Sequence, residues 1–185
     1  MTITARHVRD MLTVYLEKHP EDEEALAGLN DVLDEAGDGI TSRKEFRGHV
    51  TAGAVLLRPD GRVLTIEHRA LHRWLLPGGH LEPEDDTLML AALRELTEET
   101  AIGADDVTAQ SPVPLHIDAH PIPANPSKGE PDHRHFDFRF LFTTTVDDVV
   151  LQEEEVTGAS WQSADTLPGD ILRARVTAAA SAASA

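Results

Sequence analysis

The chain has 185 residues, of which 41% are hydrophobic, so it is long and apolar enough for one folded domain with an appendage. It contains no cysteine, which excludes disulfides, thiolate catalysis and zinc fingers and favours a reducing, cytoplasmic location. The formal net charge of −17 argues against binding to a nucleic-acid backbone or an anionic membrane. The N-terminus lacks an apolar core of signal-peptide length, and no run of residues approaches a membrane span. A phosphorylated small-molecule substrate would therefore need metal ions to offset the acidic surface.

The first part of the chain is predicted to form two helices. Apolar residues recur at helical spacing from Val8 to Leu16 and again from Ala25 to Ala36, with Pro20 between the two runs. No residue in this helical hairpin, residues 1–41, suggests chemistry. We expect the hairpin to pack on the main domain or on a second copy of the chain in a homodimer.

Strand patterns begin at His49. Runs rich in β-branched and aliphatic residues predict strands at 50–57, 62–68, 74–76, 113–120, 133–145 and 156–162. Strands interleaved with helices predict an α/β (α+β) domain over residues 42–177, with a mixed sheet between helices. A last helix is expected at 169–177, and the Ala/Ser-rich tail at 178–185 is expected to be disordered.

A further helix, from about Asp86 to Thr100, carries an acidic face. Asp85 or Asp86 is its expected N-cap. The apolar stripe predicted to be buried consists of Met89, Leu93, Leu96 and Thr100. Glu95, Glu98 and Glu99 share one face, because positions i, i+3 and i+4 lie together on a helix.

Such a carboxylate cluster favours a hard divalent cation, because Mg²⁺ takes oxygen ligands and relieves the mutual repulsion. The alternative is a solvated acidic face on which Arg94 pairs with Glu98 at i+4.

The stretch from Gly79 to Ile102 resembles the signature of the Nudix hydrolase family. Pro77-Gly78-Gly79 precedes the helix, and Arg94-Glu95-Leu96-Thr97-Glu98-Glu99 matches the acidic run of the signature. The spacing is one residue longer than usual around Asp85 and Asp86, in what we expect to be a loop before the helix. Ala101 stands where the family has Gly, from which we expect that the helix end needs no left-handed residue.

The resemblance covers residues 47–170 and implies an α/β/α sandwich with a mixed sheet and metal-dependent cleavage of a diphosphate bond. It implies that Glu95, Glu98 and Glu99 hold Mg²⁺ or Mn²⁺, that Gly78 offers its carbonyl, and that Arg94 orients the glutamates through ion pairs. The catalytic base is expected to be Glu95 or a member of the later acidic run. That run consists of Glu153, Glu154 and Glu155, and its alternative is a solvated charged segment.

The function that this resemblance implies is a Mg²⁺-dependent pyrophosphohydrolase, which uses metal-activated water to cleave a nucleoside-diphosphate-linked small molecule or a nucleotide. Two alternatives share the fold, namely a non-catalytic nucleotide-ligand sensor and a prenyl-diphosphate isomerase. Sensors usually lose the metal-binding glutamates, and all three are present here. The isomerases usually rely on a cysteine, which this chain lacks.

A second informative stretch runs from Asp132 to Phe142. With strand alternation, its phenylalanines face the core, while His133, His135, Asp137 and Arg139 face the other way. His116 and His120, on a neighbouring predicted strand, add two imidazoles. One interpretation is a substrate pocket wall in which Arg139 meets phosphate and the histidines, His120 and His135 among them, meet substrate or a second metal. The alternative is a polar outer face without such a role.

Overall fold

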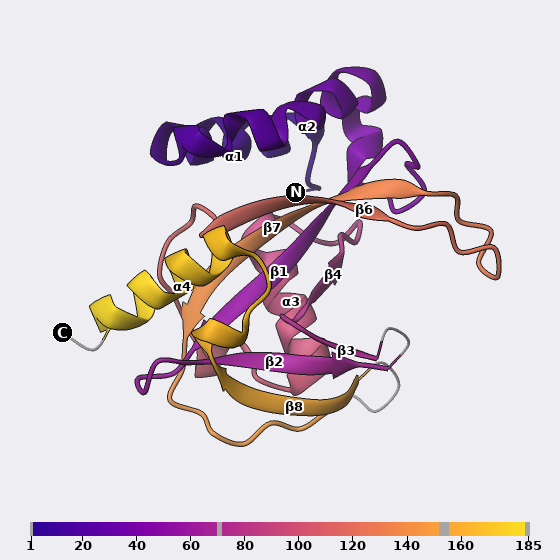
Figure 1. Cartoon of the computed structure of the whole chain (residues 1–185). Coiled ribbons are helices and arrows are strands. Elements are labelled where there is room, and N and C mark those ends of the chain that lie inside the picture. Colours follow the sequence, from indigo (N-terminus) through magenta and orange to yellow (C-terminus); the bar gives the residue numbers. More distant parts are fainter. Residues whose placement is uncertain (1, 70–71, 152–155, 184–185) are drawn as a thin grey trace. The chain divides into compact units, whose positions relative to one another are not determined.

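The computed structural model describes residues 2–69, 72–151 and 156–183 (Figure 1). The chain divides into two compact units. The first comprises Met1–Ala52, His80–Ala91 and Ile117–Phe138, and the second comprises Gly53–Gly79, Ala92–His116 and Arg139–Ala185. The division into a hairpin at residues 1–41 and a catalytic domain at residues 42–177 stays a prediction from the sequence.

The hairpin in the first unit consists of α1 (Ala5–Lys18) and α2 (Glu23–Ala36), joined by the short 3-10 helix Pro20–Asp22. Thr4 begins α1 through a capping box, because its side chain accepts from the N–H of His7 and the His7 ring accepts from the N–H of Thr4. An ion pair between Arg9 and Asp34 joins the two helices at 2.7 Å. The side chains buried along the two helices are Val8, Leu12, Tyr15, Leu26, Leu29, Val32 and Leu33. Both predicted helices are confirmed.

The strands are β1 (His49–Leu57), β2 (Arg62–His68), β3 (Arg73–Leu75), β4 (Gly78–His80), β5 (Thr108–Ala109), β6 (His116–Ile122), β7 (His133–Thr143) and β8 (Val156–Ser163). They pair in the order β3-β2-β1-β7-β5, with β4 on β1, β6 on β7 and β8 on β2. In Figure 1, β8 runs alongside β2, and seven residue pairs, from Arg62↔Ser163 to His68↔Val156, fix their register. The predicted strands are all present, and the bounds of β2 are those predicted, while the other strands have shifted ends. The sequence did not predict β4 and β5, which are short, and β4 contains two glycines, which are poor strand formers.

The remaining helices are α3 (Leu88–Thr100) and α4 (Asp170–Ala183). The predicted α/β class with a mixed sheet is confirmed. No described helix is long and apolar enough to cross a membrane.

The core of the second unit lies where α4 packs against β1 and β2. Val55, Val63, Leu172 and Val176 are buried there together. The helix α4 continues to Ala183, past the expected end at residue 177, because alanine has the highest helix propensity. Residues 178–183 are thus helical, although disorder was expected for them.

Along β7 the alternation follows the prediction. Phe136, Phe138, Phe140 and Phe142 are buried, at 1% exposure or less, while the side chains between them are partly exposed. The aromatic face of this strand is therefore core, and its polar face is available for other contacts.

Candidate active site

The loop before α3 is anchored by Asp85, which is buried. Its carboxylate accepts from the N–H of Glu82 at 2.8 Å, and its own N–H donates to the carbonyl of Glu82. The expected N-cap at Asp85 or Asp86 is wrong. Thr87 caps the helix instead, since its hydroxyl accepts from the N–H of Leu90 at 3.1 Å. Asp85 and Asp86, around which the spacing is longer than in the signature, both lie in this loop.

The expected buried stripe of α3 is only half right. Leu96 and Thr100 are buried, but Met89 and Leu93 are partly exposed. The side chains that complete the buried face are Leu88, Ala91, Ala92 and Glu99. The burial of a carboxylate among them needs a polar partner.

That partner for Glu99 is the turn before the helix. The side chain is 5% exposed, and the N–H of Gly78 donates to its Oε2 at 3.0 Å. The hydrogen bond holds the carboxylate of Glu99 against the Pro-Gly-Gly turn. From the sequence alone, the turn and the helix are only near each other along the chain. The adjacent carbonyl of Pro77 accepts from the N–H of Ala54 at 2.8 Å, so β1 holds the turn in place.

Gly79 makes room for Glu95. A β-carbon at Gly79 would lie 2.6 Å from Glu95 Oε1 and 2.7 Å from Oε2, closer than real contacts allow. Only glycine lets the strand and the carboxylate approach this closely.

Arg94 pairs with two of the glutamates. Its Nη1 lies 3.1 Å from Glu95 Oε1 and 2.9 Å from Glu98 Oε2. The side chain of Glu98 is half exposed, so the i,i+4 pair contributes little to stability, about 0.2–1 kcal/mol. The two ion pairs of Arg94 therefore orient the carboxylates of Glu95 and Glu98 and add little to the stability of the fold.

The three glutamate carboxylates do not form a tight cluster. Within the described ranges, the one group with three ligand atoms within 4.8 Å of one another consists of histidines and not of Glu95, Glu98 and Glu99. Arg94 contacts Glu95 and Glu98, whereas Glu99 is bound by the N–H of Gly78.

The C-terminal end of α3 corrects a second expectation. Ala101 adopts φ +57°, in the left-handed region, and its N–H donates to the carbonyl of Thr97 at 2.8 Å. The helix end therefore does need a left-handed residue, and alanine occupies the position at a cost of about 1–2 kcal/mol. The expectation drawn from the sequence was wrong on this point.

The polar residues of β7 have separate partners. Asp137 accepts from the hydroxyl of Thr51 at 3.2 Å, and both belong to the first unit. In the second unit, which also holds the glutamates, Arg139 Nη1 lies 3.3 Å from the Nδ1 of His116. His116 is therefore a partner of Arg139 in this unit.

The first unit contains a cluster of imidazoles. The rings of His49, His133 and His135 have centroids 4.5–5.1 Å apart. His80 lies 5.2 Å from His49 and 5.3 Å from His135, and His120 lies 5.8 Å from His135. The sequence predicted a group of His116, His120, His133 and His135, of which His116 lies in the second unit with Arg139. It did not predict that His49 and His80 join the group, through the strands β1 and β4, which pair with each other.

Burial keeps several of these imidazoles neutral. It lowers the pKa of His135 to about 2 and that of His80 to about 4, with neighbouring positive charge adding to the effect. Burial also lowers the pKa of His49. These rings therefore present lone pairs at neutral pH.

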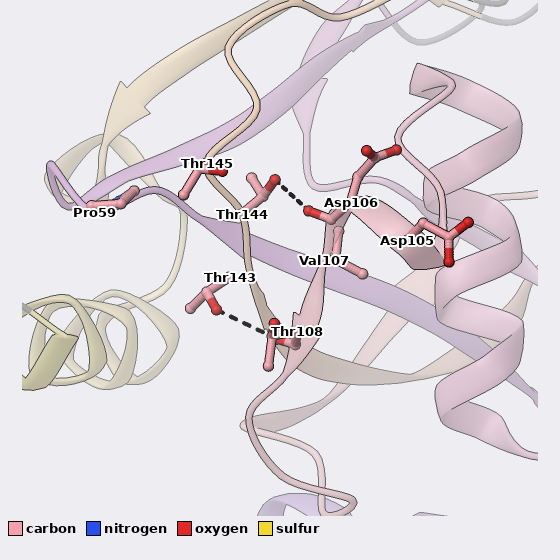
Figure 2. Close-up of a pocket in the computed structure, with 8 residues that line it drawn as sticks. All are labelled: Pro59, Asp105, Asp106, Val107, Thr108, Thr143, Thr144 and Thr145. Carbon is pink, nitrogen blue, oxygen red and sulfur yellow. Dashed lines mark hydrogen bonds between the residues drawn. The ribbon is translucent and has the colours of Figure 1, made fainter.

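Two other features lie apart from these groups. A pocket of about 300 Å³ in the second unit is lined by Pro59, Asp105, Asp106, Val107, Thr108, Thr143, Thr144 and Thr145 (Figure 2). None of the predicted site residues lines it. The proposed additional bases Glu153, Glu154 and Glu155 lie outside the described residues.

Comparison with known proteins identifies the class. The chain matches the family model of the NUDIX domain over residues 47–181. It is 32% identical over 139 residues to a probable DHNTP pyrophosphohydrolase of Lactococcus lactis, with 72% of this chain and 76% of the relative aligned. It is 35% identical over 85 residues to the RNA pyrophosphohydrolase of Erythrobacter litoralis, with 43% of this chain and 51% of the relative aligned.

The fold agrees with this class. The structure of the E. coli dihydroneopterin triphosphate pyrophosphohydrolase superposes with a TM-score of 0.53 at 20% identity, covering 69% of this chain and 91% of that one. The protein is thus a hydrolase of diphosphate bonds. It belongs to the Nudix hydrolase family, as the resemblance at Gly79–Ile102 predicted.

Proposed function

We propose that this protein is a Mg²⁺-dependent pyrophosphohydrolase that cleaves a nucleotide or a nucleoside-diphosphate-linked small molecule. The observation that carries the proposal is the close approach of Gly79 to the carboxylate of Glu95, which a side chain at Gly79 would prevent. The strand β4 leaves space for the carboxylate of Glu95, and the buried carboxylate of Glu99 lies one helical turn further along α3. Two carboxylates placed in this way can contribute to a cation-binding site. Its donors are oxygens, which Mg²⁺ prefers and Mn²⁺ also accepts.

In this proposal Glu95, Glu98 and Glu99 hold the metal, with the Gly78 carbonyl as a further donor. The bound ion supplies charge neutralisation for the phosphate oxygens and activation of water. The N–H of Gly78 holds Glu99 in place, and Arg94 sets the direction of Glu95 and Glu98. Glu95 is the proposed base, and Glu153, Glu154 and Glu155 remain predicted alternatives.

Arg139 is the proposed phosphate contact, since it lies in the same unit as the glutamates and carries a permanent positive charge. Substrate contact by His120, His135 and Asp137 stays a prediction from the sequence. So do a cytoplasmic location and a homodimer formed through the hairpin.

Charge favours a small substrate. Two relatives are named for DHNTP and for RNA. The net charge of −17 disfavours a long polyanion, so a small triphosphate or a diphosphate-linked nucleotide is the proposed substrate. Dihydroneopterin triphosphate belongs to that class and is the first compound to test.

The test is a hydrolysis screen on metal-stripped protein with Mg²⁺ or Mn²⁺ added back. The panel contains dihydroneopterin triphosphate, nucleoside triphosphates, nucleotide sugars, dinucleoside polyphosphates and a short 5′-triphosphate RNA. We expect metal-dependent release of a monophosphate product, which Glu99→Gln abolishes while circular dichroism stays unchanged. Nucleotide binding without turnover, with either metal, would instead support the sensor alternative.

A further inference from the structure

The three histidines His49, His133 and His135 present an arrangement that the proposed reaction does not use. They come from β1 and β7, and their ligand atoms lie within 4.8 Å of one another. His49 is 1% exposed and His133 is 9% exposed, so little water reaches the cluster. Burial of so many polar ring nitrogens is costly unless each one has a partner.

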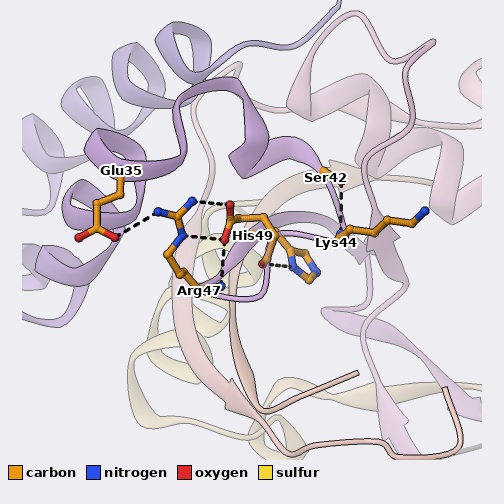
Figure 3. A network of polar contacts seen from close by, with 6 residues as sticks. Glu35, Ser42, Lys44, Arg47 and His49 are labelled. Carbon is orange, nitrogen blue, oxygen red and sulfur yellow. Dashed lines mark hydrogen bonds and ion pairs between the residues drawn. The ribbon is translucent and has the colours of Figure 1, made fainter. Parts of the chain in front are cut away.

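Backbone carbonyls determine the tautomers of two of these rings. His133 Nδ1 lies 2.8 Å from the carbonyl of Pro131. His49 Nδ1 lies 3.2 Å from the carbonyl of Glu45, a contact drawn as a dashed line at His49 in Figure 3. A carbonyl can only accept, so in both rings the proton resides on Nδ1. The Nε2 atoms of His49 and His133 therefore carry lone pairs. The same arrangement is typical of metal-binding imidazoles, whose other N–H donates to a carbonyl or a carboxylate.

The side chain of Glu45 belongs to an ion-pair network. Arg47 donates to both carboxylate oxygens of Glu45, at 2.7 and 2.9 Å, and to Glu35 at 3.3 Å (Figure 3). This ion-pair network lowers the pKa of Glu45 to about 2, chiefly through the hydrogen bond from Arg47. The Glu45 carbonyl that sets the tautomer of His49 also accepts from the N–H of Gly48 at 3.2 Å.

The Nε2 atoms of His49 and His133 differ in their partners. Within the described part of the chain, the buried Nε2 of His49 has no hydrogen-bond partner. Nε2 of His133 lies 3.2 Å from Nε2 of His135 and accepts a hydrogen bond from that ring, whose proton a metal ion would replace. In tetrahedral zinc sites with Zn–N bonds of about 2.0–2.1 Å, neighbouring nitrogens lie about 3.3 Å apart. One cation would satisfy all three rings.

We propose that His49, His133 and His135 bind a first-row transition metal ion, with Zn²⁺ as the first candidate. Imidazole suits Zn²⁺, whereas Mg²⁺ prefers oxygen, so this site takes a different cation from the glutamates of α3. His80 and His120 border the three ligands, and His120 Nδ1 is oriented by the carboxylate of Asp118 at 3.1 Å. A metal held here would replace the direct contact with substrate predicted for His135.

The test uses tag-free, full-length protein stripped with a chelator, because an affinity tag of histidines would bind the probe. Zn²⁺ is titrated in a large excess of Mg²⁺, which occupies carboxylate sites. We expect one Zn²⁺ per chain after gel filtration, measured by elemental analysis. His133→Gln and His135→Gln should each weaken Zn²⁺ binding at least about 10-fold. Glu99→Gln, and His72→Asn at an exposed histidine outside the cluster, should leave it unchanged.

Loss of folding in the histidine variants does not end the test. Co²⁺ added to the wild-type protein in excess Mg²⁺ should give the intense visible absorption of a four- or five-coordinate nitrogen site. The weak spectrum of a six-coordinate oxygen site would overturn the proposal. So would the absence of retained Zn²⁺ in excess Mg²⁺, or equal Zn²⁺ affinities of the wild type and folded histidine variants.

Discussion

The backbone of Gly79 lies so close to Glu95 that a β-carbon on the glycine would sit 2.6 Å from the glutamate's Oε1. The contact explains in physical terms why a glycine follows Gly78 at the start of the acidic segment. The absence of a side chain at Gly79 in β4 thus allows the carboxylate of Glu95 in α3 to occupy this position.

Gly79→Ala should displace the carboxylate of Glu95 without unfolding the protein. A displacement of about 1 Å at a reacting group can lower the rate about 100-fold, and we expect that loss in kcat/KM for the best substrate of the panel. The measurement is steady-state kinetics at saturating Mg²⁺. Gly28→Ala is the matched control, because a β-carbon there meets nothing within 4 Å and the helix α2 gains stability. Equal kcat/KM in the Gly79 variant and the wild type would show that the contact has no catalytic role.

Ala101→Gly should stabilise the protein. Relief of the left-handed conformation is worth about 1–2 kcal/mol, and the greater freedom of glycine in the unfolded chain offsets roughly 0.4–1 kcal/mol of it. Ala101 is exposed, so the substitution leaves no cavity. Urea unfolding should show a net gain of about 0.5–1 kcal/mol with activity unchanged. Ala27→Gly, at an exposed position inside α2, should instead destabilise by about 1 kcal/mol. A fall in stability for the Ala101 variant would contradict the strain argument.

The sequence predicts what depends on local spacing. Glu95, Glu98 and Glu99 could be assigned together because an α-helix fixes which positions share a face. The strand β7 was assigned by the same kind of argument, since alternation separates its phenylalanines from its polar residues.

What the sequence could not predict depends on pairing between distant segments. His49 and His80 enter the imidazole cluster from β1 and β4, which pair with each other, and β4 was not predicted. The proton positions on His49 and His133 depend on carbonyls in turns whose conformation no periodicity indicates. The left-handed backbone of Ala101 could not be predicted either. Whether a helix ends in that conformation depends on the path of the chain after the helix.

Arg94→Lys tests whether metal binding at α3 needs the carboxylates to be oriented by a guanidinium or needs only a positive charge beside them. One nitrogen of Arg94 contacts both Glu95 and Glu98, and the planar guanidinium fixes both carboxylates, whereas lysine supplies a mobile point charge. We expect the Mg²⁺ concentration for half-maximal activity to rise several-fold in Arg94→Lys and further in Arg94→Ala, with partial recovery at high Mg²⁺. Metal titrations of activity measure this shift. An unchanged Mg²⁺ requirement in both variants would assign Arg94 to helix stability alone.

Arg139→Gln tests the proposed phosphate contact. The guanidinium donates to the Nδ1 of His116 at 3.3 Å, which orients it, and glutamine keeps hydrogen-bonding capacity without the charge. Loss of a charged hydrogen bond of about 1.5–3 kcal/mol should raise KM at least about 10-fold. We expect kcat to change much less, because the contact forms already in the bound substrate. Arg134→Gln, at an exposed arginine on the same strand, is the control for the change in net charge. Similar KM values in the two variants would remove Arg139 from substrate binding and leave it as the partner of His116.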